Sequence, residues 1–228
     1  MRRCRPLLGT FVEIELLDED SVAIEAAFAA IVNVEQLMNF YNPHSELSKM
    51  NRDAASDETA VSLEMVAVLT LVGELYELTY GIFDASTSMA NGGDVVVNSV
   101  NQTVKYRRPL QLNLGGIAKG YAVDQAVQVL QTAGVSGGLV NAGGDLRYFG
   151  DYLPTVWVKH PRSHAPIFPI RDLHKPALAT SAPTSDISVS VAANTCMIAD
   201  ALTKVVLAMG DDAPPILARY DALAFFTS

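Results

Sequence analysis

Apolar and polar residues follow two different periods along the first third of the chain. Over residues 9–17 (GTFVEIELL) they alternate, which is the period of a strand with one buried face. Over residues 21–41 the apolar residues recur every three or four positions, and Ser21 at the start suits a helix N-cap. Residues 61–81 repeat the helical spacing and end in Gly81, a residue typical of helix C-termini. The pattern predicts a strand followed by two long helices that a polar loop connects.

Shorter apolar runs fill the rest of the chain. Helical spacing returns directly after a Gly-Gly pair at residues 115–116, and again over residues 195–209 before Gly210, which suits a C-cap. Because helices and strands mix without a regular βαβ repeat, we predict an α+β fold, with mixed or antiparallel sheets packed against long helices. No internal boundary is evident, so we expect a single domain over residues 1–228. Strands are predicted within residues 94–100, 102–108, 109–115, 137–150, 155–160, 178–194 and 222–228, and a proline-rich loop over residues 161–177.

Composition narrows the class of protein. Half of the 228 residues are apolar, which is enough for a substantial core. The net charge of −9 and the pI near 4.8 argue against nucleic-acid binding, because that binding uses positive charge to attract phosphates. No stretch approaches the ~18 uninterrupted apolar residues of a membrane span, so none is predicted. Any phosphate that this protein binds has to be held by local groups.

The cysteines and the N-terminal residues bear on the cellular compartment. Cys4 and Cys196 have no spacing typical of a metal site, and we expect no structural disulfide between them. The first residues include three arginines, but the following segment alternates and turns acidic where a secretory signal would be continuously apolar. The chain as given is therefore expected in the cytoplasm, or in the periplasm if an export signal was removed.

One cation stands where a predicted helix begins. In LNLGGIAKGYAVDQAV (residues 112–127), Lys119 follows a Gly-Gly pair by three positions, and glycines let a ligand or another backbone come close. Lys119 either contacts an anion or is a solvated lysine beside a turn. The segment alone does not choose between these two interpretations.

A second candidate lies on the last predicted helix. Asp200, Thr203 and Lys204 are spaced i, i+3 and i+4, so their side chains project from one face. Two oxygens at this spacing suit a hard cation such as Mg²⁺. In the alternative, which the spacing alone favours, Asp200 complements the helix dipole and Thr203 donates to a main-chain carbonyl.

Two loops add weaker candidates. Asp145 follows the glycines of residues 139–150, which indicate a close backbone approach or a simple turn. Tyr41, His44, Ser45 and Glu46 lie in the loop between the first two helices, where an aromatic ring suits stacking on a planar ligand. An ordinary surface loop explains these residues equally well.

Neither the histidines nor the known hydrolase motifs identify a metal site or a catalytic residue in this sequence. His160 and His164 are close in sequence, but the proline-rich segment that carries them, together with His174, does not suit a metal site. The fourth histidine is His44. No G-x-S-x-G, H-E-x-x-H or Walker motif is present, so no catalytic residue is assigned from motifs.

Seven segments taken together are far more specific than any one of them. In their order and character they resemble the ApbE family of flavin transferases, and the resemblance extends over most of the chain. The segments are PLLGTFVEIEL, FYNPHSELSKMN, YGIFDAS, LNLGGIAKGYAVDQA, LVNAGGDLRYFG, ALATS and SVSVAANTCMIADALTKVVLAMG.

The resemblance implies an ApbE-like fold and a reaction. ApbE proteins are FAD:protein FMN transferases, which use Mg²⁺ to split FAD at the pyrophosphate and attach FMN to a threonine or serine of an acceptor flavoprotein. The implied FAD contacts are Leu8, Tyr41, Ile82, Phe83, Asp84, Asn113 and Lys119, where Asn113 replaces an acidic residue of the family. The implied metal site consists of the Gly116 carbonyl, Asp200 and Thr203.

The chain also departs from the family. Between ATS and SVSV it has no room for the H-x-I-D-P-x-T-G motif of usual members, and Lys204 stands where the family commonly has a threonine. The chain therefore resembles a shortened member. Two other functions stay open: a flavin-binding or partner-binding protein that has lost catalysis, and a Mg²⁺-dependent FAD pyrophosphatase.

Overall fold

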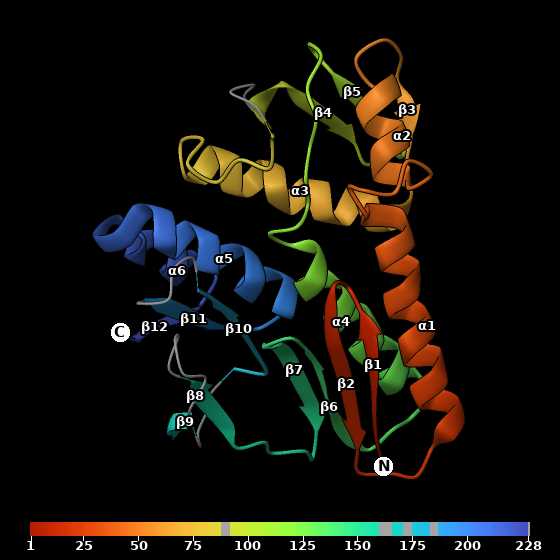
Figure 1. Ribbon diagram of the computed structural model, residues 1–228. Coiled ribbons are helices and arrows are strands. Elements are labelled where there is room, and N and C mark those ends of the chain that lie inside the picture. The colour runs from red at the N-terminus through yellow and green to blue at the C-terminus, as the bar shows by residue number, and fades with distance from the viewer. Residues whose placement is uncertain (88–91, 160–165, 171–174, 183–186, 228) are drawn as a thin grey trace. The chain divides into compact units, whose positions relative to one another are not determined.

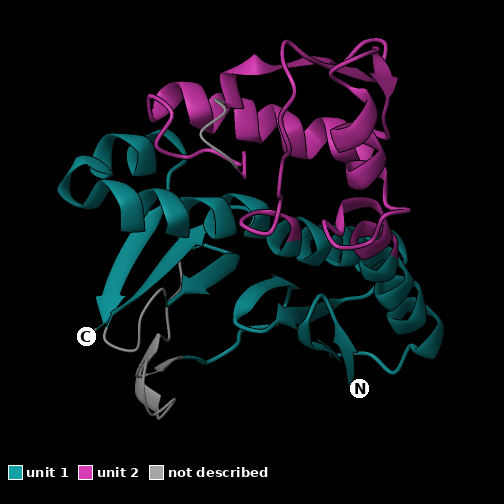
Figure 2. Cartoon of the chain, turned by 45° about the horizontal axis from the view of Figure 1, so that its top comes forward, with its two compact units in different colours: residues 1–32, 119–228 teal, residues 33–118 magenta. Residues whose placement is uncertain are grey.

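The computed structural model describes the chain except for residues 88–91, 160–165, 171–174, 183–186 and 228 (Figure 1). The chain divides into two compact units (Figure 2). Unit 1 consists of Met1–Val32 and Lys119–Ser228, and unit 2 is Asn33–Ala118. The expectation of a single domain over residues 1–228 stays a prediction.

Unit 1 contains a seven-stranded sheet in which every neighbouring pair is antiparallel. The alternation in residues 9–17 produces strand β2, which buries Val12, Ile14 and Leu16 on one face. In spatial order the strands are β1 (Arg2–Leu7), β2 (Thr10–Leu16), β6 (Gly137–Ala142), β7 (Asp145–Gly150), β10 (Ala177–Ser181), β11 (Ser188–Ala193) and β12 (Leu223–Thr227).

Helices and a small hairpin complete unit 1. Helix α5 (Cys196–Met209) lies across β10 and β11, with its predicted C-cap at Gly210 (Figure 1). The predicted loop at residues 161–177 is partly wrong, because β9 within it pairs with β8. Two prolines in this strand concealed it, since proline cannot donate to a sheet ladder. The further elements are α4 (Ala118–Thr132), 3₁₀ helix η2 (Gly210–Asp212), α6 (Pro214–Arg219), β8 (Val156–Lys159) and β9 (Pro166–Ile170).

Helix α1 (Ser21–Met38) is capped by the residue before the predicted cap. The Asp20 carboxylate, and not Ser21, accepts hydrogen bonds from the main-chain nitrogens of Val22 (3.0 Å) and Ala23 (2.9 Å). The prediction of Ser21 as the N-cap is therefore wrong. Aspartate is an equally good cap, and the sequence pattern could not rank two adjacent candidates.

Helix α1 is also long and apolar enough, by length and composition alone, to be a candidate membrane span. Its other features are those of a core helix. Ile24, Ala27 and Phe28 are buried, while Glu25 accepts hydrogen bonds of 2.6 and 2.7 Å from Arg5 on β1. A buried face of this kind is typical of a helix that packs in a protein core.

The described part of unit 2 contains two complete α-helices, one 3₁₀ helix and a three-stranded sheet. Helix α3 follows the predicted pattern, with Ser62 as its N-cap. The loop predicted before it is partly wrong, because it contains the two-turn helix α2, which Ser45 caps by accepting from the Ser48 nitrogen at 3.0 Å. A helix this short has too few apolar positions to show a period. The elements are α2 (Glu46–Asp53), β3 (Thr59–Ala60), α3 (Leu63–Leu78), 3₁₀ helix η1 (Gly92–Asp94), β4 (Val95–Asn98) and β5 (Thr103–Tyr106).

The strand predicted over residues 109–115 does not extend the sheet of unit 2. Leu112 forms a single bridge with Ser86, and its main chain is held by the side chain of Asn51. The Asn51 amide donates to the Leu112 carbonyl at 2.9 Å and accepts from the Leu112 nitrogen at 3.0 Å. A side chain therefore supplies the hydrogen bonds that a neighbouring strand would supply.

Candidate functional site

Four charged side chains meet in unit 1 and are called the charged cluster below. Lys119 lies in the first turn of α4 and Asp145 is the first residue of β7. Asp200 and Lys204 lie one turn apart on α5. The cluster thus joins residues separated by up to 85 positions (204 − 119) and contains two ammonium groups and two carboxylates.

A tight glycine turn places Asp145. Gly143 and Gly144 form the two-residue connection between β6 and β7, with φ angles of +65° and +106°. Turns of this kind favour glycine because residues with a side chain rarely adopt positive φ. The Asp145 carboxylate accepts hydrogen bonds from the Lys119 ammonium and, at 3.3 Å, from the main-chain nitrogen of Thr180. Of the two interpretations of these glycines, the structure shows the simple turn, and this turn positions a carboxylate.

Asp200 is fully buried, and each of its oxygens is engaged. Oδ1 accepts from the Lys204 ammonium, and Oδ2 accepts from the Gly120 nitrogen at 3.1 Å and lies 3.6 Å from Lys119 Nζ. Its main-chain oxygen accepts from Lys204 Nζ at 3.1 Å and from Thr203 Oγ1 at 2.7 Å. The predicted donation by Thr203 to a main-chain carbonyl is confirmed.

Both ammonium groups reach the surface, whereas both carboxylates lie beneath it. The exposed fractions of the side chains are 33% for Lys119 and 32% for Lys204, against 3% for Asp145 and 0% for Asp200. An ammonium has three N–H donors. Lys119 uses one of its N–H donors on Asp145, and Lys204 uses two of its donors on Asp200, so each ammonium can donate to a further acceptor.

Burial and charge determine the protonation of the cluster. Burial alone would lower the pKa of Lys119, but the carboxylates of Asp145 and Asp200 outweigh it and raise that pKa above the ordinary value. Burial and the nearby Asp200 charge raise the pKa of Asp145, and Lys119 opposes this shift. Lys119 is therefore a cation at neutral pH.

Asp124 on α4 joins this helix to the start of α5. Its carboxylate accepts hydrogen bonds from the main-chain nitrogens of Cys196 (2.9 Å) and Met197 (2.8 Å), and from Arg147 at 2.8 Å. Neither Asp124 nor Arg147 was predicted from the sequence. The available signal was an acidic residue at position 124 among the apolar residues of α4, four positions after Gly120.

The residues expected to bind metal do not fit a divalent cation as they are arranged. Mg²⁺ needs about six oxygen ligands near 2.1 Å. Lys204 already donates to two oxygens of Asp200, and Thr203 donates its hydroxyl hydrogen to one of them. Gly116 belongs to unit 2, so its meeting with Asp200 and Thr203 stays a prediction. No group of three or more His, Cys, Asp or Glu side chains is arranged to hold a metal in the part of the chain that the structure describes.

Four of the predicted FAD contacts lie together in unit 2. Asn113 follows the Leu112 bridge, and its main-chain nitrogen donates at 2.8 Å to the carbonyl of Ala85, next to the turn of residues 82–84. Ile82 is half-exposed and Phe83 is buried. The Asp84 carboxylate accepts from the main-chain nitrogens of Ser86 and Gly92, which shapes this loop.

The remaining candidates lie apart in sequence. Leu8 occupies the turn between β1 and β2 in unit 1, with a φ of +56°. Tyr41 of unit 2 is 85% exposed and contacts Phe40 edge to face at 5.4 Å between ring centroids. His44, three residues later in the sequence, is exposed. His160, His164 and His174 lie outside the described residues, so the expectation that they do not bind metal stays untested.

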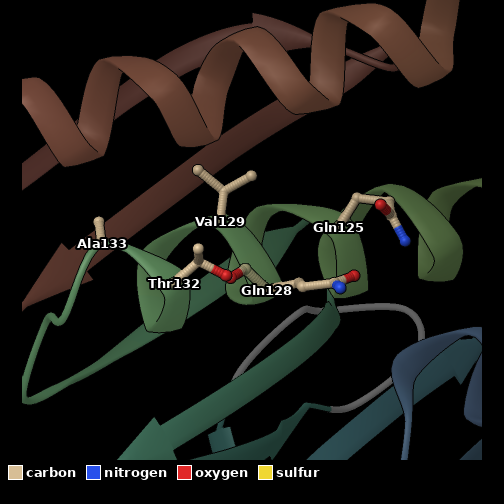
Figure 3. Close-up of a pocket in the computed structure, with 5 residues that line it drawn as sticks. All are labelled: Gln125, Gln128, Val129, Thr132 and Ala133. Carbon is tan, nitrogen blue, oxygen red and sulfur yellow. The ribbon is translucent and has the colours of Figure 1, made fainter.

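A shallow pocket of about 420 Å³ lies on one face of α4 (Figure 3). None of its lining residues is titratable, and none belongs to the charged cluster. This pocket therefore differs from the site assembled above. The lining residues are Gln125, Gln128, Val129, Thr132 and Ala133.

Comparison with known proteins identifies related sequences. A sequence model described as the ApbE family matches residues 8–92 and 89–187. A Vibrio cholerae protein named FAD:protein FMN transferase is 24% identical over 177 residues, covering 64% of this chain and 53% of its own length. A Chlamydia pneumoniae protein of the same name is 26% identical over 175 residues, covering 65% and 54%. The chain thus spans about half the length of these curated relatives.

Solved structures show the same fold. The ApbE protein of Thermotoga maritima has a TM-score of 0.84 at 22% identity, over 99% of this chain and 93% of its own. The flavin transferase ApbE of Vibrio cholerae has a TM-score of 0.84 at 21% identity, over 99% and 92%. These matches confirm the predicted α+β fold of ApbE type.

Proposed function

The chain belongs to the ApbE family, and on this premise we propose that it binds FAD and transfers the FMN half to a threonine or serine hydroxyl of an acceptor flavoprotein. The hydroxyl oxygen attacks the phosphorus attached to the riboflavin part of FAD. A phosphoester bond forms, the bond from that phosphorus to the bridging oxygen of the pyrophosphate breaks, and AMP leaves. The hydroxyl proton passes to AMP or to solvent, so the products are flavinylated protein and AMP.

One observation carries this proposal: Lys119, in one of the seven segments that resemble the family, is a partly exposed cation fixed by a buried carboxylate. A fixed ammonium is suited to a pyrophosphate because charge-assisted hydrogen bonds to phosphate oxygens are strong. It also compensates the negative charge on the oxygens of the transferred phosphoryl group. Such electrostatic compensation is usually the largest contribution to catalysis in this reaction type. Lys119 thus binds and orients the pyrophosphate.

No described residue is assigned as the base that removes the hydroxyl proton. Asp145 and Asp200 are each engaged by a lysine, and the histidine motif of usual members is missing from the sequence. General-base help is typically worth about 10²–10⁴-fold in rate. We therefore expect slow transfer.

Mg²⁺ was expected as the metal ion of this reaction, but the arrangement of Asp200, Thr203 and Lys204 does not fit it. At the charged cluster, the chain itself supplies two cationic groups, Lys119 and Lys204. FAD is the proposed substrate, and an acceptor flavoprotein is the proposed partner.

The test is to incubate the purified chain with FAD and an acceptor flavoprotein, with Mg²⁺ and with EDTA. Intact mass measures flavinylation and chromatography measures AMP. Equal amounts of protein-bound FMN and AMP support transfer, and an acceptor whose target threonine is replaced by valine is the control. AMP without bound FMN indicates a pyrophosphatase, and FAD binding without AMP indicates a binding protein. Absence of both binding and AMP refutes the proposal.

A further inference from the structure

We propose that the Lys204 ammonium takes the place of a divalent cation at Asp200, so that this chain binds the pyrophosphate of FAD without a metal ion. That the ligand is FAD rests on the proposed function. That Asp200 binds no metal ion is inferred only from the contacts within the charged cluster.

The contacts of Lys204 are those that a bound cation would make. Its Nζ donates to Asp200 Oδ1 and to the Asp200 main-chain oxygen, so two oxygens of one residue hold one positive group. Thr203, the second expected ligand from this helix, is buried and donates to the same main-chain oxygen. A metal ion would have to displace the ammonium from both oxygens.

Burial makes a permanent positive partner necessary for Asp200. The Asp200 side chain is 0% exposed, and a buried carboxylate that loses its partner is strongly destabilising. Lys204 belongs to the same helix as Asp200 at i+4, so the partner is supplied locally and needs no ion from solution. The pair therefore favours the metal-free state.

The charge balance gives the same result. With both lysines and both aspartates ionised, the cluster carries no net charge (2 − 2 = 0), which leaves no excess of negative charge to attract Mg²⁺. A neutral residue at position 204 would leave a net charge of −1. A Mg²⁺ ion there would then give +1, one positive charge more than the natural cluster. We thus expect Lys204→Thr to make FAD binding depend on Mg²⁺.

A metal titration without FAD tests the first half of the inference. Mn²⁺ is added to the natural protein, to Lys204→Thr and to the double variant Lys204→Thr/Asp200→Asn, and bound Mn²⁺ is measured by electron paramagnetic resonance. We expect no Asp200-dependent binding in the natural protein, one Mn²⁺ in Lys204→Thr, and loss of that ion in the double variant. One Mn²⁺ per natural chain that Asp200→Asn abolishes would overturn the inference.

FAD binding, measured by flavin fluorescence in EDTA and in Mg²⁺, tests the second half. The natural protein should bind FAD equally in both, whereas Lys204→Thr should bind roughly tenfold more weakly in EDTA and recover in Mg²⁺, because one charge-assisted contact is lost and then replaced. Lys175→Thr is the matched control, since Lys175 pairs with Asp221 outside the cluster. Mg²⁺-dependent FAD binding by the natural protein contradicts the inference.

The two proposals fail in different ways. If the natural protein binds FAD in neither buffer, the proposed function is wrong, while the Mn²⁺ titration still decides whether Lys204 excludes a metal. Far-ultraviolet circular dichroism shows whether each variant is folded. If Lys204→Thr does not fold, Lys204→Met in the same EDTA and Mg²⁺ buffers serves instead: weaker FAD binding supports the inference, and unchanged binding opposes it.

Discussion

The main-chain nitrogen of Gly120, on α4, donates a hydrogen bond to the Asp200 carboxylate of α5 at 3.1 Å. This bond requires the two helices to approach closely. A Cβ atom on Gly120 would lie 2.6 Å from the carbonyl carbon of Cys196 and 2.8 Å from the Cα of Met197. Only glycine allows this approach, which holds Lys119, the neighbouring residue, at the charged cluster.

Gly120→Ala should therefore destabilise the protein, by about 1–3 kcal/mol, because the backbone of α5 must shift to admit the methyl group. Urea denaturation measures the free energy of unfolding. Gly73→Ala in α3 is the matched control, since a Cβ there meets nothing within 4 Å. Alanine at that helical site should stabilise by about 0.4–1 kcal/mol. Equal effects at the two positions would contradict this account of Gly120.

Asp124→Ala should lower the free energy of unfolding by about 2–3 kcal/mol, because it removes the acceptor of two main-chain nitrogens in the first turn of α5 and leaves the partly buried Arg147 without this carboxylate. Thermal and urea denaturation measure the loss. Asp124→Asn keeps one acceptor oxygen for a main-chain nitrogen, so its free energy of unfolding should fall less than that of Asp124→Ala. Asp211→Ala, at an exposed position, is the control. A loss no larger than that of the control would show that Asp124 does not hold the start of α5.

Lys119→Ala should weaken FAD binding by about 1.5–3 kcal/mol, roughly 10- to 100-fold, if the ammonium contacts the pyrophosphate as proposed. Isothermal titration calorimetry measures the affinity, with Lys175→Ala as the control lysine of unit 1. Unchanged FAD affinity in Lys119→Ala would show that Lys119 does not contact the pyrophosphate and is only a lysine beside a turn.

The pKa of Lys119 predicts how stability depends on alkaline pH. That pKa is raised above its ordinary 10.5 in the folded state, so the folded protein holds this proton more tightly than the unfolded chain does. The resulting stability is fully present below pH 10.5 and is lost as the pH rises through the higher folded-state value. Between these two pH values, the free energy of unfolding should fall more steeply for the natural protein than for Lys119→Met.

Denaturant unfolding at several pH values from neutral to strongly alkaline measures the two slopes. The tyrosines ionise in both proteins, so their contribution cancels in the difference. Parallel curves for the natural protein and Lys119→Met would show that the carboxylates of Asp145 and Asp200 do not hold the Lys119 proton.

The sequence by itself determined the elements whose apolar residues keep one period over many positions. Strand β2 and helices α3 and α5 follow directly from alternation or from a three- and four-residue spacing, since each buries one face. It also indicated Lys119 as a cation at a glycine turn and Asp200, Thr203 and Lys204 as one helix face. Short elements such as α2 and β9 were missed because they have too few apolar positions or contain proline.

Only the tertiary structure decided how the charges pair. Lys119 and Asp145 are 26 residues apart, and Asp124 and Cys196 are 72 apart, so no local period relates them. Their meeting depends on the order of strands in the sheet and on the close approach of α4 and α5 at Gly120. The spacing of Asp200 and Lys204 was evident from the sequence, but a solvated lysine and one that pairs with a buried carboxylate have the same spacing. Burial of Asp200 distinguishes them, because a carboxylate removed from water needs a fixed positive partner.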